Sequence, residues 1–322
     1  MTGQMLRDKV VIITGAARGL GEAHARACAA EGAAVVVTDI EQGEVERVAE
    51  EIRSAGGVAL AVGGDISSWA VCEQVVDVAK REFGRVDGLV NNAAITIPTA
   101  PFEETEELIR RHFEVNVYGT FFMSIVASRA MNGKGSIVNT TSGSQSGTPF
   151  SSMYGATKGA ISSLTYCWAL DFAAAGSQVR VNALSPHAAT PMMTASAEFF
   201  KDKGISSKLK SAAPDPSTVS PVVVYLLSDS SNQVNGQVVR MQDGRLLSLT
   251  THPANLNPPL YRDSWTPQDI AAAFEEELTA KQLPTGATYY NATVVEPPTD
   301  LATFVPRALT EVTPTPVTGS GV

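Results

Sequence analysis

Two side chains that can exchange a proton stand four residues apart: Tyr154 and Lys158, in the segment Tyr-Gly-Ala-Thr-Lys. This spacing places both on one face of a helix. A free tyrosine has a pKa near ~10, too high for efficient proton exchange at neutral pH, but a neighbouring ammonium favours the phenolate. Ser142, at the carboxyl end of a predicted strand, can donate a hydrogen bond to a substrate oxygen. The pattern indicates general acid–base chemistry, although Tyr-x-x-x-Lys alone is also a common accident.

A phosphate-binding loop is predicted near the N-terminus. An apolar run at residues 10–13 leads straight into Thr-Gly-Ala-Ala-Arg-Gly-Leu-Gly at residues 14–21. Glycines between a strand and a helix let the backbone approach a pyrophosphate, and the helix N-terminus supplies free N–H groups. Asp39 ends the next predicted strand, where a carboxylate accepts hydrogen bonds from a ribose 2′-hydroxyl and repels a 2′-phosphate. The sequence therefore predicts NAD in preference to NADP, and Arg18 either softens that preference or lies in solvent.

Strand-like and helix-like patterns alternate from residue 9 to about 242. Residues 33–39 are apolar and β-branched without interruption, which is typical of a strand buried on both faces. Strands joined by helices predict an α/β fold with a single doubly wound parallel sheet, Rossmann-like, whose ligands bind at the carboxyl ends of the strands. The predicted strands are 9–14, 33–39, 58–62, 86–91, 136–141, 179–184 and 237–242, and the predicted helices are 19–31, 41–55, 67–83, 103–131, 152–175 and 217–228.

Two regions break this alternation. Residues 187–216 read as a long irregular loop, the usual form of a lid or binding element. After Gly244 the alternation stops, so we expect a catalytic domain at 1–244 and a C-terminal extension at 245–322. Within the extension we expect a loop at 245–264, a helix from residue 266 to about 281, and a Pro/Thr-rich tail from residue 297.

Composition narrows the class of protein. The chain has 322 residues, a formal charge of −9 and a pI near 5.0, so repulsion from phosphates argues against a nucleic-acid or anionic-membrane partner. No run of about 18 apolar residues is present, and the polar opening segment lacks the apolar stretch of a signal peptide. Three widely separated cysteines fit neither a disulfide framework nor a zinc site, so we expect a cytoplasmic chain without a metal.

The motifs together resemble the short-chain dehydrogenase/reductase family from residue 7 to about residue 244. Thr-Gly-x-x-x-Gly-x-Gly at 14–21, Asn-Asn-Ala-Ala at 91–94 and Ser142 with Tyr154 and Lys158 carry the resemblance. It implies that Tyr154 is the general acid/base, Ser142 orients the substrate oxygen, and Lys158 holds the nicotinamide ribose. Asn116 would anchor a water that leads protons to solvent. The implied cofactor contacts are Gly15, Arg18, Gly19, Leu20, Gly21, Asp39, Asp65, Ile66, Asn92, Tyr154, Lys158 and Thr190.

The sequence is compatible with two classes of substrate. Apolar side chains at Met192, Met193, Phe199 and Phe200 either line a site for a bulky alcohol, such as a steroid-like one, or only pack beneath the loop. The segment Pro-His-Ala-Ala-Thr-Pro-Met at 186–192 is more loosely similar to the (3R)-hydroxyacyl-CoA dehydrogenase unit of peroxisomal multifunctional enzymes, which favours a 3-hydroxyacyl thioester. In that case Lys201, Lys203, Lys208 and Lys210 could meet a CoA phosphate, although loop lysines are more often solvated.

Two further expectations complete this interpretation. The family resemblance implies a small-molecule substrate and a homo-oligomer, dimer or tetramer, paired through the helices predicted at 103–131 and 152–175. A non-catalytic NAD-binding sensor or scaffold is the alternative from another class. Such proteins typically lack the tyrosine or the lysine, and this chain has both.

Overall fold

One eight-stranded sheet forms the centre of the protein. The computed structural model describes residues 4–202, 213–242, 244–250, 270 and 273. Contacts between Cα atoms group residues 1–250 into one unit and 251–322 into a second, and the elements below belong to the first. In order across the sheet, the strands are β3 (Val58–Gly63), β2 (Ala34–Asp39), β1 (Val10–Thr14), β4 (Gly88–Asn91), β5 (Lys134–Thr140), β6 (Gln178–Pro186), β7 (Val238–Gln242) and β8 (Leu246–Leu249).

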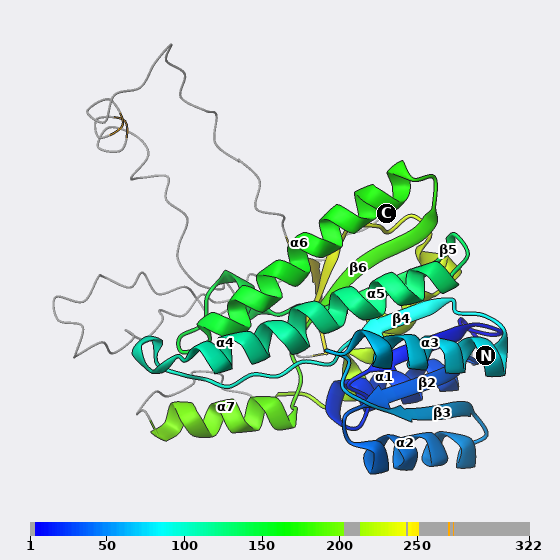
Figure 1. Cartoon of the computed structure of the whole chain (residues 1–322), viewed down its shortest axis with the longest axis horizontal. Coiled ribbons are helices and arrows are strands. Elements are labelled where there is room, and N and C mark those ends of the chain that lie inside the picture. Colours follow the sequence, from blue (N-terminus) through cyan, green and yellow to red (C-terminus); the bar gives the residue numbers. More distant parts are fainter. Residues whose placement is uncertain (1–3, 203–212, 243, 251–269, 271–272, 274–322) are drawn as a thin grey trace, which may run out of the picture. The chain divides into compact units, whose positions relative to one another are not determined.

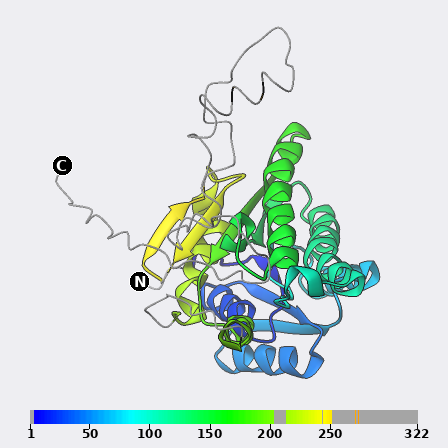
Figure 2. The same ribbon diagram turned by 90° about the vertical axis from the view of Figure 1, so that its left-hand side faces the viewer.

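The first seven strands run parallel to their neighbours, and only β8 is antiparallel, to β7. The chain leaves β3 at one edge and returns to β4 beside β1, so the strand order reverses between β1 and β4. Figure 2 shows β7 and β8 in yellow at the sheet edge away from the blue strands. The α/β prediction of a doubly wound, Rossmann-like sheet is confirmed.

Helices cover both faces of the sheet. One core cluster joins α1, α2 and α8 to the sheet, and a second joins α3 and α5, with side chains of α6 packed against it. In Figure 1, α3, α5 and α6 lie on one side of the sheet and α2 on the other. The helices are α1 (Gly19–Ala30), α2 (Gln42–Ser54), α3 (Trp69–Phe83), α4 (Glu106–His112), α5 (Gly119–Ala130), α6 (Ser152–Ala174), α7 (Pro191–Asp202) and α8 (Ser220–Leu227).

This double cover explains the apolar strands. All five residues of β1 are buried, and they alternate between the two clusters: Val11 and Ile13 in one, Val10 and Ile12 in the other. A strand that faces core on both sides needs apolar side chains at every position, so its sequence shows no polar alternation. The continuous apolar runs predicted the sheet for this reason.

The helix predicted over 103–131 is present over residues 106–130, but it is not a regular α-helix throughout. A short 3₁₀ turn at Pro101–Glu103 precedes α4, and a π-helical segment at Phe113–Tyr118 separates α4 from α5. A π-helix carries one more residue per hydrogen-bonded turn and often marks a functional position. Asn116 lies in its centre. No proline interrupts this stretch, which is why the sequence pattern reads as one helix.

Two predicted loops also contain regular structure. Residues 187–216 were expected to be irregular, but α7 begins at Pro191, where the Thr190 hydroxyl accepts a hydrogen bond from the Met193 N–H (3.2 Å). Thr before Pro is a helix start signal that the loop prediction passed over. The sheet also continues past residue 244: Gly244 has φ +64°, and the Arg245 N–H bonds the Gln242 carbonyl, which turns the chain back into β8.

Some predictions fall largely outside the described residues. Of the helix expected from residue 266 to about 281, Ile270 and Ala273 are described, and both are helical. The tail from residue 297 lies outside them. No helix in the described part of the chain is both long and apolar enough to cross a bilayer.

Candidate active site

The glycine loop joins β1 to α1 with very little free space. Gly15 has φ +65°, and a Cβ there would lie 2.6 Å from Ala93 Cα. A Cβ on Gly21 would lie 2.1 Å from the Gly15 carbonyl oxygen. Close approach of other backbone atoms therefore excludes a side chain at both positions. At Gly15 the positive φ angle disfavours a side chain as well. Gly19 has φ +60° and opens α1, so the backbone can present helix N-terminal N–H groups to an anion.

The end of β4 locks this loop in place. Asn92 Nδ2 donates to the Gly15 carbonyl (3.0 Å) and to the Thr14 carbonyl (3.2 Å). In return, Thr14 Oγ1 accepts from the N–H groups of Asn92 and Ala93, both at 3.1 Å. The structure thus brings predicted Asn92 against the glycine loop. The loop motif includes Thr14 but does not identify it as a site residue. The sequence feature that could have identified it is a hydroxyl side chain at the end of a buried strand.

Asp39 contacts the glycine loop at Ala17, next to Arg18. One carboxylate oxygen of Asp39 accepts from the Ala17 N–H (3.2 Å) and the other from the Glu41 N–H (3.3 Å). Each carboxylate oxygen keeps a further lone pair. Arg18 is exposed and precedes α1, and Leu20 is half-buried in its first turn. Asp39 therefore holds the loop and keeps acceptor capacity on both carboxylate oxygens.

Asp65 already has partners within the protein. Its carboxylate accepts from the Ser67 N–H and hydroxyl and pairs with Arg111 of α4 (2.8 Å). Burial raises the pKa of Asp65, but the hydrogen bonds from Ser67 and Arg111 outweigh it and hold the pKa below its ordinary value. Ile66 is buried against Gly119, where a Cβ would lie 2.6 Å from Ile66 Cδ1. Asp65 thus fixes the turn at the end of β3, a role the sequence did not show.

Asn116 connects two segments of the site. It is 1% exposed, and its Oδ1 accepts from the Ile95 N–H (2.8 Å). Its Nδ2 donates to the Ile95 carbonyl and to Thr157 Oγ1, each at 3.0 Å. Thr157 in turn donates to the Tyr154 carbonyl (2.8 Å). The π segment turns Asn116 towards these partners, so the chain after Asn92 is tied to the first turns of α6.

Ser142 lies two residues after the end of β5 and caps a 3₁₀ turn at Gly143–Ser146. Its Oγ accepts from the Ser144 N–H (3.1 Å), and the hydroxyl keeps its own proton to donate. The turn packs on α6, since a Cβ on Gly155 would lie 2.7 Å from the Ser144 carbonyl oxygen. The end of β5 is thereby held against the turn of α6 that carries the predicted acid–base pair.

Tyr154 and Lys158 lie together on α6. Lys158 Nζ is 5.4 Å from the centroid of the Tyr154 ring and donates to the Thr140 carbonyl at 2.7 Å. The lysine is 3% exposed, and burial lowers its pKa to about 7. A low-dielectric site disfavours the ammonium, because the charged form of Lys158 loses its hydration when it is buried. At neutral pH this side chain is therefore close to its titration point.

Thr190 completes the set. It caps α7, and a Cβ on Gly19 would lie 3.8 Å from its Cβ, so it stands beside the glycine loop. The glycine loop, Asp39, Asp65, Asn92, Ser142 and Thr190 therefore lie at or shortly after the carboxyl ends of parallel strands, near the point where the strand order reverses. That is where ligands bind in open α/β sheets. Asn116, Tyr154 and Lys158 lie on helical segments that contact the chain there: Asn116 bonds Ile95, and Lys158 bonds Thr140 at the end of β5. A hollow of about 550 Å³ lies at the opposite edge, lined by residues such as Arg7, Arg85 and Arg180, and it contains none of these residues.

The site fits a nicotinamide dinucleotide and offers little to a metal. Its loop is a cradle that a Cβ would fill at Gly15 or Gly21, as close approach of a pyrophosphate requires. Among the residues that the structure describes, no group of three or more His, Cys, Asp or Glu side chains could hold a metal ion. The chemistry available is hydrogen bonding to an oxygen and transfer of its proton.

Comparisons with known proteins identify the family. The family model described as "Enoyl-(Acyl carrier protein) reductase" matches residues 15–245. The chain belongs to the short-chain dehydrogenase/reductase family. It is thus an oxidoreductase of a family that acts on alcohols and ketones with nicotinamide cofactors, and the predicted resemblance is confirmed.

Three relatives illustrate the range of this family. Meso-2,3-butanediol dehydrogenase of Serratia marcescens is 34% identical over 75% of this chain and 96% of its own. The chloroplastic NADPH-dependent aldehyde reductase 1 of Arabidopsis thaliana is 34% identical over 76% and 88%. A crystal structure of a short chain dehydrogenase from Mycobacterium paratuberculosis bound to NAD is 26% identical, with a TM-score of 0.68 over 74% of this chain and 98% of its own.

Proposed function

We propose that this protein is an NAD-dependent alcohol dehydrogenase or ketone reductase that interconverts a secondary alcohol and its ketone. The observation that carries the proposal is the position of Tyr154 and Lys158. They lie on α6, which is tied through Thr157 and Asn116 to the segment after β4, and that segment is bonded to the glycine loop. A proton-transfer pair and a dinucleotide cradle therefore share one edge of the sheet.

The choice of NAD is supported by Asp39. The glycine loop and the start of α1 would hold the pyrophosphate, and Asp39 would accept from the 2′-hydroxyl of the adenosine ribose with its remaining lone pairs. A 2′-phosphate would meet this carboxylate and be repelled. Asp65, Ile66 and Asn92 would border the adenine side, and Thr190 the nicotinamide carboxamide. The bound dinucleotide supplies or accepts the hydride.

The proton step is assigned to side chains of this chain. Ser142 donates to the substrate oxygen, and Tyr154 takes the alcohol proton in oxidation or returns it in reduction. Lys158 favours the phenolate when it is protonated. Asn116 uses both Nδ2 protons within the protein, and its Oδ1 retains a lone pair for a water that leads protons away.

The substrate is proposed to be a bulky, apolar secondary alcohol such as a steroid-like one. Helix α7 carries Met192, Met193 and Phe199, and the ring of Phe199 meets that of Phe150 edge to face at 5.8 Å. Phe150 stands four residues before Tyr154 and has φ +57°, a rare conformation for an aromatic residue. The aromatic pair therefore joins α7 to the loop between Ser142 and Tyr154. The side chains of Phe200 and Lys201, and Lys203, Lys208 and Lys210, lie outside the described residues.

A substrate panel tests the proposal. Purified protein is given NAD or NADP with steroid alcohols, small cyclic alcohols or (3R)-3-hydroxyacyl-CoA esters, and reduction of the cofactor is followed. We expect turnover of an apolar alcohol with NAD, lost in Tyr154→Phe and kept in Tyr166→Phe on the same helix. A preference for the CoA esters would favour the alternative substrate class. If the protein bound NADH but Tyr154→Phe left every reaction rate unchanged, the enzyme proposal would be wrong. The non-catalytic NAD-binding sensor or scaffold would then be the better interpretation.

We also propose a cytoplasmic homo-oligomer, dimer or tetramer. Aromatic and aliphatic side chains remain on the outside of the helices expected to pair: Leu170 of α6 is 72% exposed, and Tyr118, just before α5, is 51% exposed. Apolar side chains exposed on neighbouring helices favour association. Light scattering coupled to gel filtration measures the state directly, and a monomer at micromolar concentration would contradict the proposal.

A further inference from the structure

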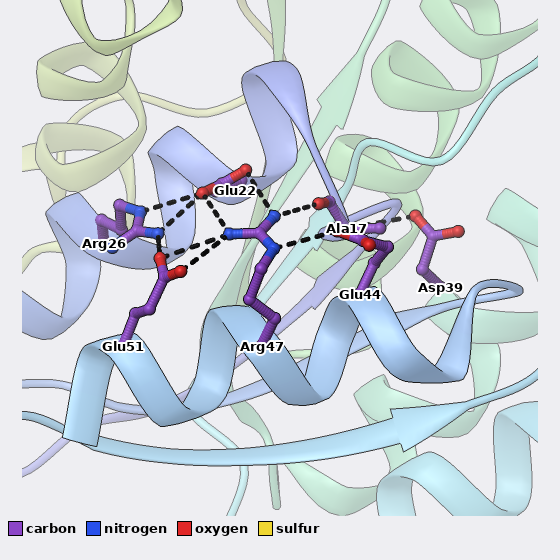
Figure 3. A network of polar contacts seen from close by, with 7 residues as sticks. All are labelled: Ala17, Glu22, Arg26, Asp39, Glu44, Arg47 and Glu51. Carbon is purple, nitrogen blue, oxygen red and sulfur yellow. Dashed lines mark hydrogen bonds and ion pairs between the residues drawn. The ribbon is translucent and has the colours of Figure 1, made fainter. Parts of the chain in front are cut away.

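Arg47 reaches from α2 to the glycine loop. Its Nη2 donates to the Ala17 carbonyl at 3.1 Å, although the two residues are 30 positions apart in the chain. Figure 3 shows the guanidinium between Ala17 on one side and Glu22 of α1 and Glu51 of α2 on the other. This contact has no signal in the sequence, because α2 carries two arginines and four glutamates, a composition typical of a solvated helix face.

Ala17 is thereby held through both of its backbone groups. Its N–H donates to Asp39 (3.2 Å), and its carbonyl accepts from Arg47 (Figure 3). In a trans peptide the C=O and the following N–H point in opposite directions. With the Ala17 carbonyl fixed towards Arg47, the N–H of Arg18 must point away from α2. Arg18 is the residue before α1, so this N–H belongs to the set that faces an anion at the helix start.

The opposite peptide orientation would harm anion binding. It would turn the Ala17 carbonyl, a partial negative charge, towards the place of the pyrophosphate and remove one donor. Gly15 and Gly19 on either side have positive φ and leave the backbone between them adaptable. A loop of this kind needs an external contact to keep one orientation. Arg47 supplies that contact from a neighbouring helix.

Carboxylates hold the guanidinium in position. Arg47 Nε donates to Glu44 (2.9 Å), Nη1 to Glu51 (3.2 Å) and Nη2 to Glu22 (3.3 Å). Arg26 of α1 also pairs with Glu22 (2.7 Å) and with Glu51. Isolated surface ion pairs stabilise little, but a planar arginine fork shared among several acceptors is geometrically fixed. Glu22 is the least exposed of the three acids at 21%, and it lies in the first turn of α1 itself.

We propose that Arg47 is a positioning residue for the dinucleotide: it keeps the peptide between Ala17 and Arg18 in the orientation that binds the pyrophosphate. This inference rests on the proposed use of NAD. It concerns the loop alone, and Arg47 touches neither the substrate nor the acid–base pair. Loss of Arg47 should weaken every ligand that carries the pyrophosphate while leaving adenosine binding nearly unchanged.

The same helix provides a matched control. Arg53 pairs with Glu46 (2.7 Å) and Glu50 (2.7 Å) and donates to a backbone carbonyl, that of Ala59, at 3.1 Å. Its exposure, 36%, is close to the 38% of Arg47. Arg53 therefore has the same kinds of partner as Arg47 but none in the glycine loop. The variants Arg47→Met and Arg53→Met remove comparable ion pairs from one helix.

The test measures binding and loop order rather than turnover. Dissociation constants for NADH and ADP-ribose are measured by calorimetry, and amide exchange of residues 17–20 is followed in the free protein. We expect Arg47→Met to weaken both ligands about 10-fold and to speed exchange in the loop, and Arg53→Met to change neither by more than about 2-fold. Arg47→Lys, which keeps the charge without the fork, should weaken both ligands about 3-fold.

Each failure has its own signature. Wild-type protein that binds neither NADH nor ADP-ribose would end the proposed function, and this inference with it. Wild-type protein that binds both, with Arg47→Met no weaker than Arg53→Met, would overturn the inference alone. If Arg47→Met does not fold, Arg47→Lys decides: wild-type affinity for ADP-ribose together with wild-type exchange at Arg18 would overturn it.

Discussion

The ammonium of Lys158 donates a 2.7 Å hydrogen bond to the carbonyl of Thr140, at the end of β5. The lysine is thereby held beneath the tyrosine ring in a site that excludes water. One carbonyl is a weak replacement for the water that a lysine ammonium loses on burial. The burial of this ammonium therefore costs stability, and several measurable consequences follow from it and from the loop contacts.

Replacing Lys158 by Met should stabilise the protein while it abolishes activity. Burial lowers the lysine pKa from its ordinary value to about 7. Between pH 7 and the pKa of a free lysine the unfolded chain binds the extra proton, so wild-type stability rises with pH across this window. Lys158→Met lacks this dependence. Its gain in unfolding free energy should be on the order of 1–3 kcal/mol at pH 6 and should shrink towards pH 10.

Urea titrations at several pH values measure this difference. Turnover should fall by about 10²–10⁴-fold in the same variant, because the phenolate loses its neighbouring charge. Lys134→Met, which alters an exposed lysine, serves as the control and should change neither quantity. A gain in stability that is the same at pH 6 and pH 10 would show that the lysine is not titrating as proposed.

The rate of alcohol oxidation should rise with pH around an apparent pKa near 7. Oxidation needs a pair that has lost one proton, and the Tyr154–Lys158 pair shares its protons as a unit. The lowered pKa of Lys158, about 7, places the loss of the first proton of the pair near neutral pH, and the active form is the one whose remaining proton is on Lys158 while Tyr154 is the phenolate. The measurement is kcat/KM against pH with saturating NAD. A kcat/KM value that stays constant from pH 6 to 9 would contradict this prediction.

Replacing Asp39 by Ala should relax the discrimination against NADP and also weaken NAD. The carboxylate repels a 2′-phosphate, so its loss should reduce the preference for NAD about 10- to 100-fold. It also accepts from the Ala17 N–H, so the loop loses a contact. The ratio of kcat/KM values for the two cofactors measures the first effect, and Glu41→Gln is the control. An unchanged ratio would discredit the role given to Asp39.

Replacing Asn116 by Ala should destabilise the fold by about 2–4 kcal/mol, because both backbone groups of Ile95 lose their side-chain partner inside the protein. Thr120→Val removes one buried hydrogen bond nearby and should cost less than about 1 kcal/mol. Denaturant unfolding compares the two variants. Equal losses would mean that the amide of Asn116 does not hold the segment after β4.

Replacing Gly21 by Ala should abolish dinucleotide binding, since the new Cβ would lie 2.1 Å from the Gly15 carbonyl oxygen. Gly43→Ala at the start of α2 meets no atom within 4 Å and should leave affinity unchanged. Calorimetry with NADH makes the comparison. Binding by Gly21→Ala at wild-type affinity would show that the loop is looser than its packing indicates.

The sequence predicted those features that arise from short stretches of chain. The apolar strands, the glycine loop and the Tyr154–Lys158 spacing each follow from neighbouring residues, because backbone turns and helix faces are set over a few positions. The family resemblance added the role of Asn116. The signals for α7 and β8 were also local, a Thr-Pro pair and a glycine turn, and were read as loop.

Only the tertiary structure decided what these residues contact. The pairing of Asp65 with Arg111, the reach of Arg47 to Ala17 and the burial of Lys158 each join segments far apart in the chain. The π-helical segment that carries Asn116, the partner of Ile95, has no residue pattern that distinguishes it from an ordinary α-helix. A side chain's charge state and orientation depend on which distant groups surround it, and residue order alone does not contain that arrangement.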